Sequence, residues 1–415
     1  MGKSFALVAS DLHLKKRTWS SRPIEGDSYF AWEQIVDTAI REAVEVVILA
    51  GDILDKQING SGPIVKLQEG IEKLGAAGIK TLFIQGQHEY QEMPWASLSK
   101  HAIHLHRNEA TSLDPFIEVA GYTIAGIDFQ AKERLQDELS YVAETLKSPP
   151  EKTILVTHQV WEEWMGERAL PQGKLADVNN WLPGLGLLIT GDLHESRLED
   201  EPLRVLSPGS TCMQSISEPE DKYVYLLSSS DGPLDPQSTT SDVSRGSSAG
   251  SLEIRRSALL GRPFIDWPFM GTVEDIEDCI REYYTVYEDS QSHAEQHSIP
   301  EEICKPLVRF QYGHSLSGEV HRLEKLVGDT GHIFWKEHVP KDVVADEIIT
   351  SGDHVTMESL LKSVECNDSV RQLAERLLAG GDPNQELHRW HKAVSYTHLR
   401  AHETDSYLVC RLLLE

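Results

Sequence analysis

The sequence predicts an α/β protein in which short buried strands alternate with amphipathic helices. Apolar runs rich in β-branched residues or leucine recur through about the first 210 residues, and helical patterns separate them. Each run ends in a polar cluster, and layered α/β proteins gather their chemistry at the carboxyl ends of strands. The expected strands are Ala6–Ser10, Val46–Ala50, Thr81–Gln85, Thr153–Thr157 and Leu187–Thr190.

Helix signals lie between these strands. Asp27 and Ser28 are typical of a helix N-terminus and predict a helix through Ala43. Pro63 is typical of a first helical turn and predicts a helix through Ala77.

Two further strands, Lys222–Leu227 and Ser251–Arg256, flank a segment rich in Ser, Gly and Asp. This composition is typical of flexible chain. Because strand-forming sequence resumes directly beyond it, we interpret residues 228–250 as a long flexible loop within a β-hairpin. A linker between two domains is the alternative.

A second region, from residue 262 to about residue 349, predicts a small accessory domain. The expected elements are a helix at Val273–Tyr287, a strand at Lys305–Tyr312, a helix at Gly318–Val327 and a strand at His332–Val339. This β-α-β-like pattern carries no cluster of metal-ligating residue types.

The C-terminal part changes character twice. Residues 356–393 predict amphipathic helices broken by the turn Gly380–Pro383, either as a partner-binding element or as a helical pair packed on its own domain. Residues 394–415 resemble a sequencing-library adapter translated in one frame, so we expect them to be an artefact. Functional reasoning therefore leaves out His398, His402 and Cys410.

Charge and composition narrow the function. The chain has 415 residues, of which 40% are hydrophobic and 25% charged, as in globular proteins of two or three domains. A net charge of −27 argues against broad binding to polyanions, so a nucleic-acid site must be local, metal-assisted or supplied by a partner. No apolar run is long enough to predict a membrane span. The five cysteines are scattered and form no CxxC pair, so the sequence predicts neither a disulfide framework nor a zinc ribbon. Together these features predict a cytoplasmic protein.

Five polar clusters directly follow predicted strands. They are Asp11-Leu12-His13, Gly51-Asp52-Ile53-Leu54-Asp55, Gly86-Gln87-His88-Glu89, Thr157-His158-Gln159 and Gly191-Asp192-Leu193-His194. At a strand end, residues i and i+2 point the same way, so each Asp-x-His presents a carboxylate and an imidazole together. These ligands without a thiolate favour Mn²⁺, Fe²⁺ or Zn²⁺ and disfavour a structural zinc site.

The order of the clusters resembles the calcineurin-like metallophosphoesterases, whose pattern is DxH, GDxxD, GNH[DE], H and GHxH. A closer likeness, to the SbcD-type DNA-repair nucleases, rests on three later segments. These are SPGST at Ser207–Thr211, GRPF at Gly261–Phe264 and GHIFWKE at Gly331–Glu337. The likeness extends from Phe5 to about Val339.

This resemblance implies the architecture. It would be a four-layer α/β/β/α metallophosphoesterase sandwich over residues 1–261, with a small α+β capping domain at residues 262–349. A C-terminal helical tail would follow at residues 356–393.

The resemblance also implies a two-metal site. The ligands of the first ion would be Asp11, His13, Asp52 and His194. Asp52 would bridge to a second ion, completed by Gln87, His158 and Asp192. The ions would be two Mn²⁺, or Mg²⁺, which activate water and neutralise phosphoryl charge. His88 would orient the phosphate and protonate the departing 3′ oxygen.

Two residues depart from the family pattern, and both belong to the second ion. Gln87 stands where the family usually has Asn, and Asp192 stands where it usually has His. The added carboxylate is a harder ligand and favours Mn²⁺ or Mg²⁺ over zinc. One interpretation is an active variant in which the two changes compensate for each other. The alternative is a degenerate second site in a weak or inactive enzyme.

The function implied is that of the nuclease subunit of an SbcCD-type double-strand-break repair complex. It would be a manganese-dependent phosphodiesterase, acting as an exonuclease on duplex DNA and an endonuclease on single strands. Its partners would be DNA, an SbcC-type ATPase and a second copy of itself, with no membrane. One alternative is a phosphodiesterase or phosphomonoesterase of small nucleotides, and another is a catalytically weak scaffold for DNA ends.

Other residues have weaker assignments. A short basic run, which would contact the DNA backbone or simply be solvated, comprises Lys15, Lys16, Arg17 and Arg22. Trp161 and Trp164 would stack on an unpaired base or, as we favour, pack in the core or against a partner. Asp55 and Glu89 would orient ligands or have plain N-cap and turn roles. Surface or internally bonded histidines are expected at His101, His104 and His106.

Overall fold

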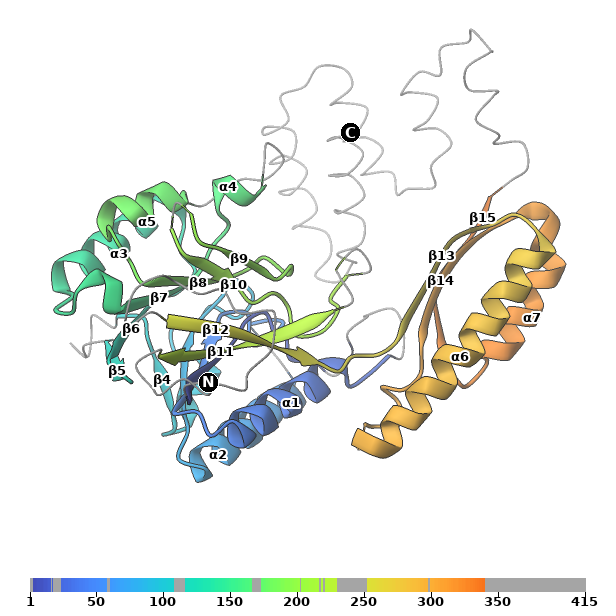
Figure 1. The fold of residues 1–415 in the computed structure, drawn as a ribbon, viewed down its shortest axis with the longest axis horizontal. Helices are drawn as coiled ribbons and strands as arrows, with labels where there is room; N and C mark the ends of the chain where they lie inside the picture. The colour runs from blue at the N-terminus through green and yellow to red at the C-terminus, as the bar shows by residue number, and fades with distance from the viewer. Residues whose placement is uncertain are drawn as a thin grey trace, which may run out of the picture. The chain divides into compact units, whose positions relative to one another are not determined.

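A computed structural model describes residues 3–15, 17, 24–57, 60–107, 116–165, 173–201, 203–215, 218, 221–229, 252–297 and 299–339. A six-stranded mixed sheet holds the N-terminal strand beside strands from late in the chain (Figure 1). In spatial order its strands are β12 (Leu252–Leu259), β11 (Lys222–Ser229), β1 (Ser4–Ala9), β2 (Val46–Ala50), β3 (Lys80–Ile84) and β4 (Ala102–His104). Strands β1 to β4 are parallel, and β11 and β12 form an antiparallel pair next to β1.

A second six-stranded sheet is built from the middle of the chain. In spatial order its strands are β5 (Ile117–Val119), β6 (Tyr122–Ile127), β7 (Thr153–His158), β8 (Leu187–Gly191), β10 (Val205–Ser207) and β9 (Arg197–Glu199). The four inner strands are parallel, and the short edge strands β5 and β9 are antiparallel to their neighbours. The carboxyl ends of β7 and β8 therefore point the same way.

Helices cover the outer faces of both sheets. On the first sheet lie α1 (Asp27–Arg41) and α2 (Ser61–Ala76), and on the second lie α3 (Lys132–Thr145) and α5 (Leu175–Trp181); the short α4 is Glu162–Met165. In α1, the buried residues Ala31, Trp32, Ile35 and Ala39 recur at the spacing of one helix face.

Strand alternation divides the core into layers. In β1, Leu7 packs toward α1 and α2, whereas Ala6 and Val8 pack against the second sheet. A third apolar layer joins the second sheet to α3 and α5. The predicted four-layer α/β/β/α sandwich is thus confirmed.

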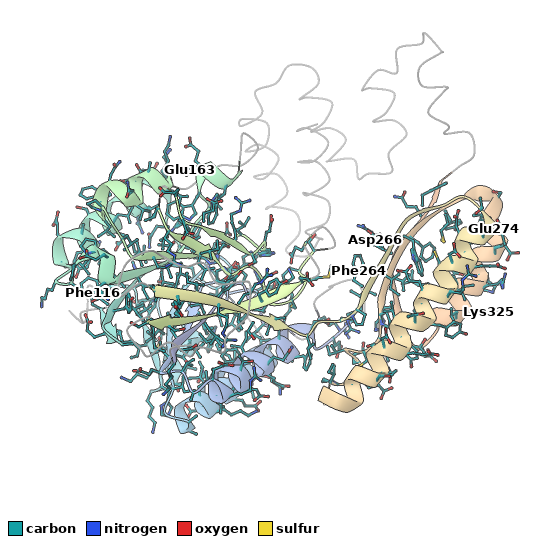
Figure 2. All side chains as sticks on the ribbon, in the orientation of Figure 1. Phe116, Glu163, Phe264, Asp266, Glu274 and Lys325 are labelled. Atoms are coloured by element: carbon teal, nitrogen blue, oxygen red, sulfur yellow. The ribbon has the colours of Figure 1, made fainter. Side chains whose placement is uncertain are left out.

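The residues beyond β12 have a core of their own. Three parallel strands, β13 (Phe264–Met270), β14 (Leu307–Gly313) and β15 (His332–Val339), alternate with α6 (Val273–His297), the 3-10 turn η4 (His314–Leu316) and α7 (Ser317–Val327). Their core contains Trp267, Tyr283, Phe310 and Leu323. Glu274 and Lys325 lie on the exposed sides of the two helices (Figure 2). The β-α-β pattern predicted for this region is therefore present.

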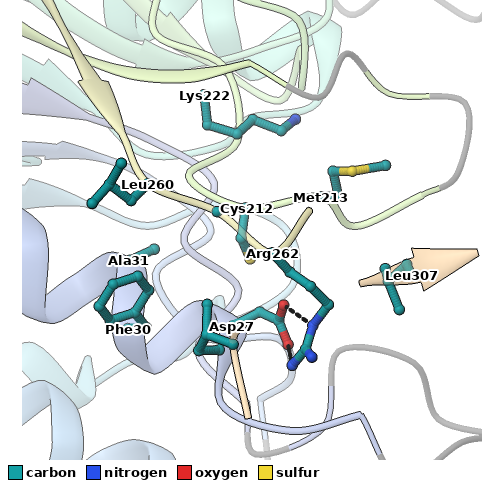
Figure 3. Close-up of a pocket in the computed structure, with 11 residues that line it drawn as sticks. Asp27, Phe30, Ala31, Cys212, Met213, Lys222, Leu260, Arg262 and Leu307 are labelled. Atoms are coloured by element: carbon teal, nitrogen blue, oxygen red, sulfur yellow. Dashed lines mark hydrogen bonds and ion pairs between the residues drawn. The ribbon is translucent and has the colours of Figure 1, made fainter. Parts of the chain in front are cut away.

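Arg262 fixes the segment that leads into this region (Figure 3). Its guanidinium donates to both carboxylate oxygens of Asp27, at 2.9 and 3.2 Å, and to the carbonyl of Lys305 at 3.0 Å. The Arg262 side chain is only 2% exposed. A bidentate arginine–carboxylate pair at a buried position is geometrically demanding, so the GRPF segment has a structural role.

Most predicted strands agree with the structure to within one or two residues, but some elements are longer. Helix α6 continues to His297 rather than to the predicted Tyr287, and β11 includes Ser228 and Ser229, the first two residues of the predicted loop. Residues 230–251 and 340–415, which include most of that loop and the predicted tail helices, lie outside the described residues. Residues 1–339 form one unit by their contacts, so a boundary at residue 261 stays a prediction. No helix among the described residues is long and apolar enough to span a bilayer.

Candidate metal centre

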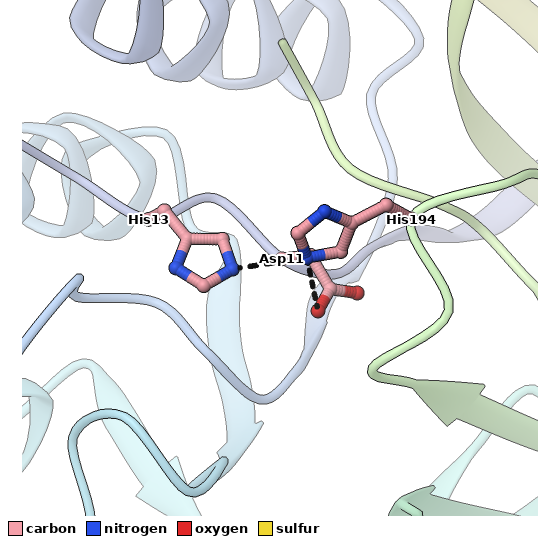
Figure 4. A group of neighbouring side chains, drawn as sticks. All are labelled: Asp11, His13 and His194. Atoms are coloured by element: carbon pink, nitrogen blue, oxygen red, sulfur yellow. Dashed lines mark hydrogen bonds and ion pairs between the residues drawn. The ribbon is translucent and has the colours of Figure 1, made fainter. Parts of the chain in front are cut away.

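Asp11, His13 and His194 form a first group of ligand atoms (Figure 4). His13 Nε2 lies 3.2 Å from His194 Nε2, which lies 3.8 Å from Asp11 Oδ1. Asp11 and His13 follow β1 in the first sheet, and His194 follows β8 in the second. The two sheets therefore contribute to one group.

Asp52, just beyond β2, lies at the centre of a second group. Its Oδ2 atom is 3.4 Å from His158 Nε2, 3.6 Å from His13 Nε2 and 3.8 Å from His88 Nε2. Its Oδ1 atom accepts a 3.1 Å hydrogen bond from the backbone N–H of His88. The Asp52 side chain is only 1% exposed, so its carboxylate faces these imidazoles rather than solvent. This central position is compatible with the bridging role predicted for Asp52.

Gln87 and Asp192, the two departures from the family pattern, contact each other. Gln87 Nε2 donates a hydrogen bond to Asp192 Oδ1. The same oxygen lies 3.8 Å from His158 Nε2. The backbone N–H of Asp192 donates to both oxygens of Asp11, at 3.1 and 3.2 Å. All eight predicted site residues therefore converge, and their individual roles stay predictions.

Four of these residues have a backbone conformation that side chains disfavour. The φ angles are 51° at Asp11, 42° at His13, 47° at Asp52 and 81° at Asp192, among six such non-glycine residues in the described chain. Each left-handed residue costs roughly 1–3 kcal/mol and persists only where the surroundings enforce it. Here the backbone N–H groups of Asp11 and His13 donate to the carbonyls that follow β2, at 3.1 and 2.9 Å. Strain is thus concentrated where the loops present the ligand atoms.

Two motif glycines are required by close approach. Gly51 has a φ of 85°, and a Cβ there would collide with the imidazole of His158. A Cβ at Gly86 would collide with the carboxylate of Asp52. Since neither neighbour can withdraw without leaving the site, these positions exclude larger residues.

The histidines are held through their Nδ1 atoms. His158 Nδ1 lies 2.7 Å from the carbonyl of Ala50, and His88 Nδ1 lies 3.1 Å from the carbonyl of Asp55. A carbonyl can only accept, so Nδ1 carries the hydrogen in each ring. When such a ring is neutral, its Nε2 atom directs a lone pair into the site, as in metal-binding histidines.

His194 is held in the same way by a residue that the sequence did not reveal. Its Nδ1 atom lies 2.7 Å from Glu218 Oε1. Glu218 is one of three acidic residues in the run SEPED, and no local pattern distinguishes it from the others. Its nearness to the SPGST segment, already noted at Ser207–Thr211, was the one available signal.

The carboxylates and imidazoles of the site strongly shift one another's pKa values. Burial alone would lower the pKa of His158, but nearby carboxylates, foremost Asp52, raise it to about 10. Burial alone would raise the pKa of Asp52, yet neighbouring imidazoles, foremost His158, hold it well below its usual range. Burial raises the pKa of Asp11, although the nearby imidazoles oppose this. Such mutual shifts are typical of a functional site.

Two observations show that the donor set fits divalent cations. His158 Nε2 and Gln87 Oε1 are buried and have no hydrogen-bond partner among the described residues. The Nε2 atoms of His13 and His194 also face each other at 3.2 Å, an arrangement that a shared cation would stabilise. Unpaired buried donors and acceptors are costly, so each calls for a ligand.

Cation binding is expected to release protons. His158, with a pKa raised to about 10, is protonated at neutral pH, whereas a ligand nitrogen must be neutral. The apparent affinity for Mn²⁺ should therefore increase between pH 6.5 and 8, with about one proton released per chain from this residue. Calorimetric titrations in buffers of different ionisation enthalpy measure that release; a buffer-independent heat would contradict it.

Asp55 and Glu89 both contact parts of the site. Asp55 Oδ1 lies 3.5 Å from His13 Nδ1 and accepts a 2.6 Å hydrogen bond from Lys15 Nζ. Glu89 accepts from the backbone N–H groups of Gly86 and Leu54, which tie two motif loops together. Burial, reinforced by Asp52, raises the pKa of Glu89 to about 8. These contacts favour orienting roles over plain turn roles.

The basic run after the first motif is partly occupied by ion pairs. Lys15 pairs with Asp55, and Arg17 Nε lies 2.9 Å from Glu25 Oε1. Lys16 and Arg22 lie outside the described residues. Contact between this run and DNA stays a prediction. For Lys15 and Arg17, a DNA phosphate would have to compete with the carboxylate already paired with the side chain.

The two tryptophans differ in environment. Trp161 is 1% exposed and donates to Thr190 Oγ1 at 3.0 Å, so it packs in the core as expected. Trp164 donates to Glu199 and lies under the guanidinium of Arg197.

Two of the three clustered histidines have internally hydrogen-bonded rings, and the third lies near a carboxylate. His104 Nε2 lies 2.8 Å from Asp128 Oδ1, and His101 Nε2 lies 3.7 Å from a carboxylate oxygen of Glu72. The ring of His106 accepts a hydrogen bond from the backbone N–H of Asp128. None of the three belongs to the metal-ligand groups found among the described residues.

Comparison with known proteins agrees with this geometry. DNA double-strand break repair protein Mre11 of Sulfurisphaera tokodaii is 32% identical over 171 residues, covering 39% of this chain and 42% of that protein. Mre11 of Methanosarcina acetivorans is 26% identical over 377 residues, covering 87% of this chain and 55% of that protein. The uncharacterized metallophosphoesterase YhaO of Bacillus subtilis is 23% identical, covering 54% and 57%. The matched part thus spans about half the length of each relative.

A family model also matches the chain, by the description "Calcineurin-like phosphoesterase", over residues 6–196. This range contains most of β1, all of β2 to β8 and all eight candidate site residues. Residues 6–196 are therefore similar to the calcineurin-like phosphoesterase domain.

Proposed function

We propose that the protein is a manganese-dependent DNA nuclease, the nuclease subunit of an SbcCD-type double-strand-break repair complex. The observation that carries the proposal is the convergence of eight motif residues, from five strand ends in two sheets, around three overlapping groups of candidate metal-ligand atoms. The naming of several relatives as DNA double-strand break repair proteins supports the substrate class. Metal-dependent cleavage would let an acidic chain act on a polyanion.

The chain's residues would divide between two ions. The first would be held by Asp11, His13, Asp52 and His194, and the second by Asp52, Gln87, His158 and Asp192. Bound divalent ions would supply neutralisation of phosphoryl charge and a lowered pKa for the attacking water. Asp52 lies centrally among three imidazoles and would be the ligand that the two ion positions share.

His88 would act on the substrate. Its side chain is 46% exposed, whereas those of His13 and His158 are at most 4% exposed. Its Nε2 atom lies at the edge of the site, and Nδ1 is held by the carbonyl of Asp55. This exposure suits a residue that orients the phosphate and donates a proton to the departing 3′ oxygen.

Asp192 would set the choice of metal. Its carboxylate shares the second site with Asp52 and His158, where a second imidazole would stand in the family pattern. Replacing Asp192 by His is expected to raise the affinity for Zn²⁺ relative to Mn²⁺ by about tenfold, since imidazole is the softer ligand. Competition titration of the two metals measures the ratio. A large gain in the Mn²⁺-dependent cleavage rate would instead show that the natural second site is degenerate.

The remaining assignments concern partners. An SbcC-type ATPase bound through residues 356–393 would supply the DNA affinity that a net charge of −27 does not favour. The nuclease itself would be a homodimer.

A comparison of substrates tests the proposal. The purified protein with Mn²⁺ is assayed on end-labelled linear duplex DNA, single-stranded circular DNA, bis(p-nitrophenyl) phosphate and p-nitrophenyl phosphate. Cleavage of both DNAs and the phosphodiester, with little action on the monoester, is expected. Preference for the monoester would favour a small-nucleotide phosphatase. Bound Mn²⁺ without turnover of any phosphodiester would favour a scaffold for DNA ends.

A further inference from the structure

Glu218 connects the candidate ligand His194 to a buried polar network. One carboxylate oxygen, Oε1, lies 2.7 Å from His194 Nδ1. The other, Oε2, accepts from Ser210 Oγ at 2.8 Å, Lys222 Nζ at 2.8 Å and the backbone N–H of Gln214 at 3.1 Å. The Glu218 side chain is 8% exposed. Both oxygens therefore have defined partners.

Lys222 is buried together with Glu218. Its side chain is 5% exposed, and its ammonium also donates to Ser210 Oγ at 2.8 Å. It lines a cavity of about 20 Å³ with Cys212, Asp27 and Arg262 (Figure 3). This cavity holds no more than one water, so Glu218 is the charged partner on which the ammonium depends.

We propose that Glu218 is a positioning residue that fixes the tautomer and orientation of His194 for metal binding. A carboxylate can only accept, so His194 Nδ1 must carry the hydrogen, and in the neutral ring Nε2 then presents its lone pair. That Nε2 faces Asp11 and His13, at 3.8 and 3.2 Å. The inference rests on the proposed metal centre and adds to it a group that does not itself touch the metal.

His194 depends on this contact more than the other candidate ligands do. His158 is fully buried and is held by a backbone carbonyl, which no side-chain substitution removes. The side chain of His194 is 30% exposed, so less of its ring is fixed by packing. Outer contacts of this kind are worth about 10–100-fold in metal affinity or activity.

Glu218→Gln tests the proposal well because the neighbouring hydrogen-bond donors determine which way the new side-chain amide is oriented. Lys222 Nζ and the Gln214 N–H can only donate, so the oxygen of the introduced amide must face them. The NH₂ group of that amide then faces His194 Nδ1 and donates to it. The hydrogen of His194 is thereby moved to Nε2, where it blocks the ligand atom.

The first readout is the tautomer itself. In metal-free protein with ¹⁵N-labelled histidine, long-range ¹H–¹⁵N spectra should show Nδ1–H for His194 in the wild type and Nε2–H in Glu218→Gln. The signal is assigned from its loss in His194→Ala. An unchanged Nδ1–H tautomer in the variant would overturn the proposal.

The second readout is the affinity for Mn²⁺, measured by calorimetry. Glu218→Gln should bind Mn²⁺ about 10–100-fold more weakly than the wild type. The matched control is Glu138→Gln on α3, which neutralises a similarly buried carboxylate that is paired with Arg107. The control should keep wild-type affinity. Equal losses in both variants would show a general structural effect and reject the positioning role.

In Glu218→Gln the buried Lys222 ammonium loses its charged partner, and the protein could unfold for that reason. A double variant addresses this case. Glu218→Gln combined with Lys222→Met removes that charge but leaves the Gln214 N–H facing the amide oxygen, so the same tautomer change is expected. Neither readout involves DNA. A protein that binds Mn²⁺ through Glu218-dependent His194 but cleaves no DNA would refute the nuclease function and leave this inference intact.

Discussion

Replacing Asp52 by Asn is expected to lower the rate of Mn²⁺-dependent DNA cleavage by at least about 10³-fold, because it removes the anion common to both proposed metal positions. Asp52 belongs to two of the three ligand groups found among the described residues, together with His13, His88 and His158. An amide has one neutral oxygen and cannot bridge two cations as a carboxylate does. Calorimetry should therefore count fewer Mn²⁺ ions per chain in the variant than in the wild type.

The matched control for this variant is Asp128→Asn. Asp128, like Asp52, is 1% exposed and lies beside an imidazole, in this case that of His104, but it belongs to none of the ligand groups. It should lose stability through the weakened pair with His104 and keep the wild-type number of bound ions. Equal ion counts in Asp52→Asn and the wild type would remove Asp52 from the metal centre.

The strand ends could be predicted from the sequence because their signals are local. Fully buried strands such as β2 and β8 appear as short apolar runs, and the next residues, Asp52 and Asp192, carry the chemistry. Parallel pairing then brings such ends to one edge without further information. These two facts account for the convergence within each sheet, whereas the meeting of residues from both sheets depends on how the sheets pack together.

The residues that support the site could not be predicted in this way. Glu218 follows His194 by 24 positions, and the hydrogen bond between them depends on how the chain returns past β9 and β10. Lys15 likewise appeared as a free cation, because its partner Asp55 is 40 positions away. Pairing across such separations is set by tertiary packing, on which a local pattern carries no information.

The backbone strain at the site also could not be predicted from the sequence. Aspartate and histidine with positive φ are unusual, and nothing in the DxH pattern itself indicates that Asp11 and His13 adopt it. Only the hydrogen bonds to the loop after β2 show what enforces it. Functional sites commonly break local rules in this manner, since the surrounding fold stabilises them.

Replacing His88 by Asn is expected to lower kcat on DNA by about 10²–10³-fold while leaving Mn²⁺ affinity within about threefold of the wild type. The reason is the position of the side chain, which is 46% exposed at the edge of the site rather than buried among the carboxylates. A residue that protonates the leaving oxygen affects the chemical step, not the assembly of the metal centre. His101→Asn, at a histidine paired with Glu72, is the control and should retain activity.

The leaving group of the substrate separates the two roles proposed for His88. The departing 3′ alkoxide of DNA needs a proton, whereas nitrophenolate is stable without one. The deficit of His88→Asn should therefore shrink by at least about tenfold on bis(p-nitrophenyl) phosphate, if proton donation is its main contribution. An equal deficit on both substrates would assign His88 to phosphate orientation alone. Loss of a bound ion would instead make it a ligand, a role that its 3.8 Å distance from Asp52 Oδ2 allows.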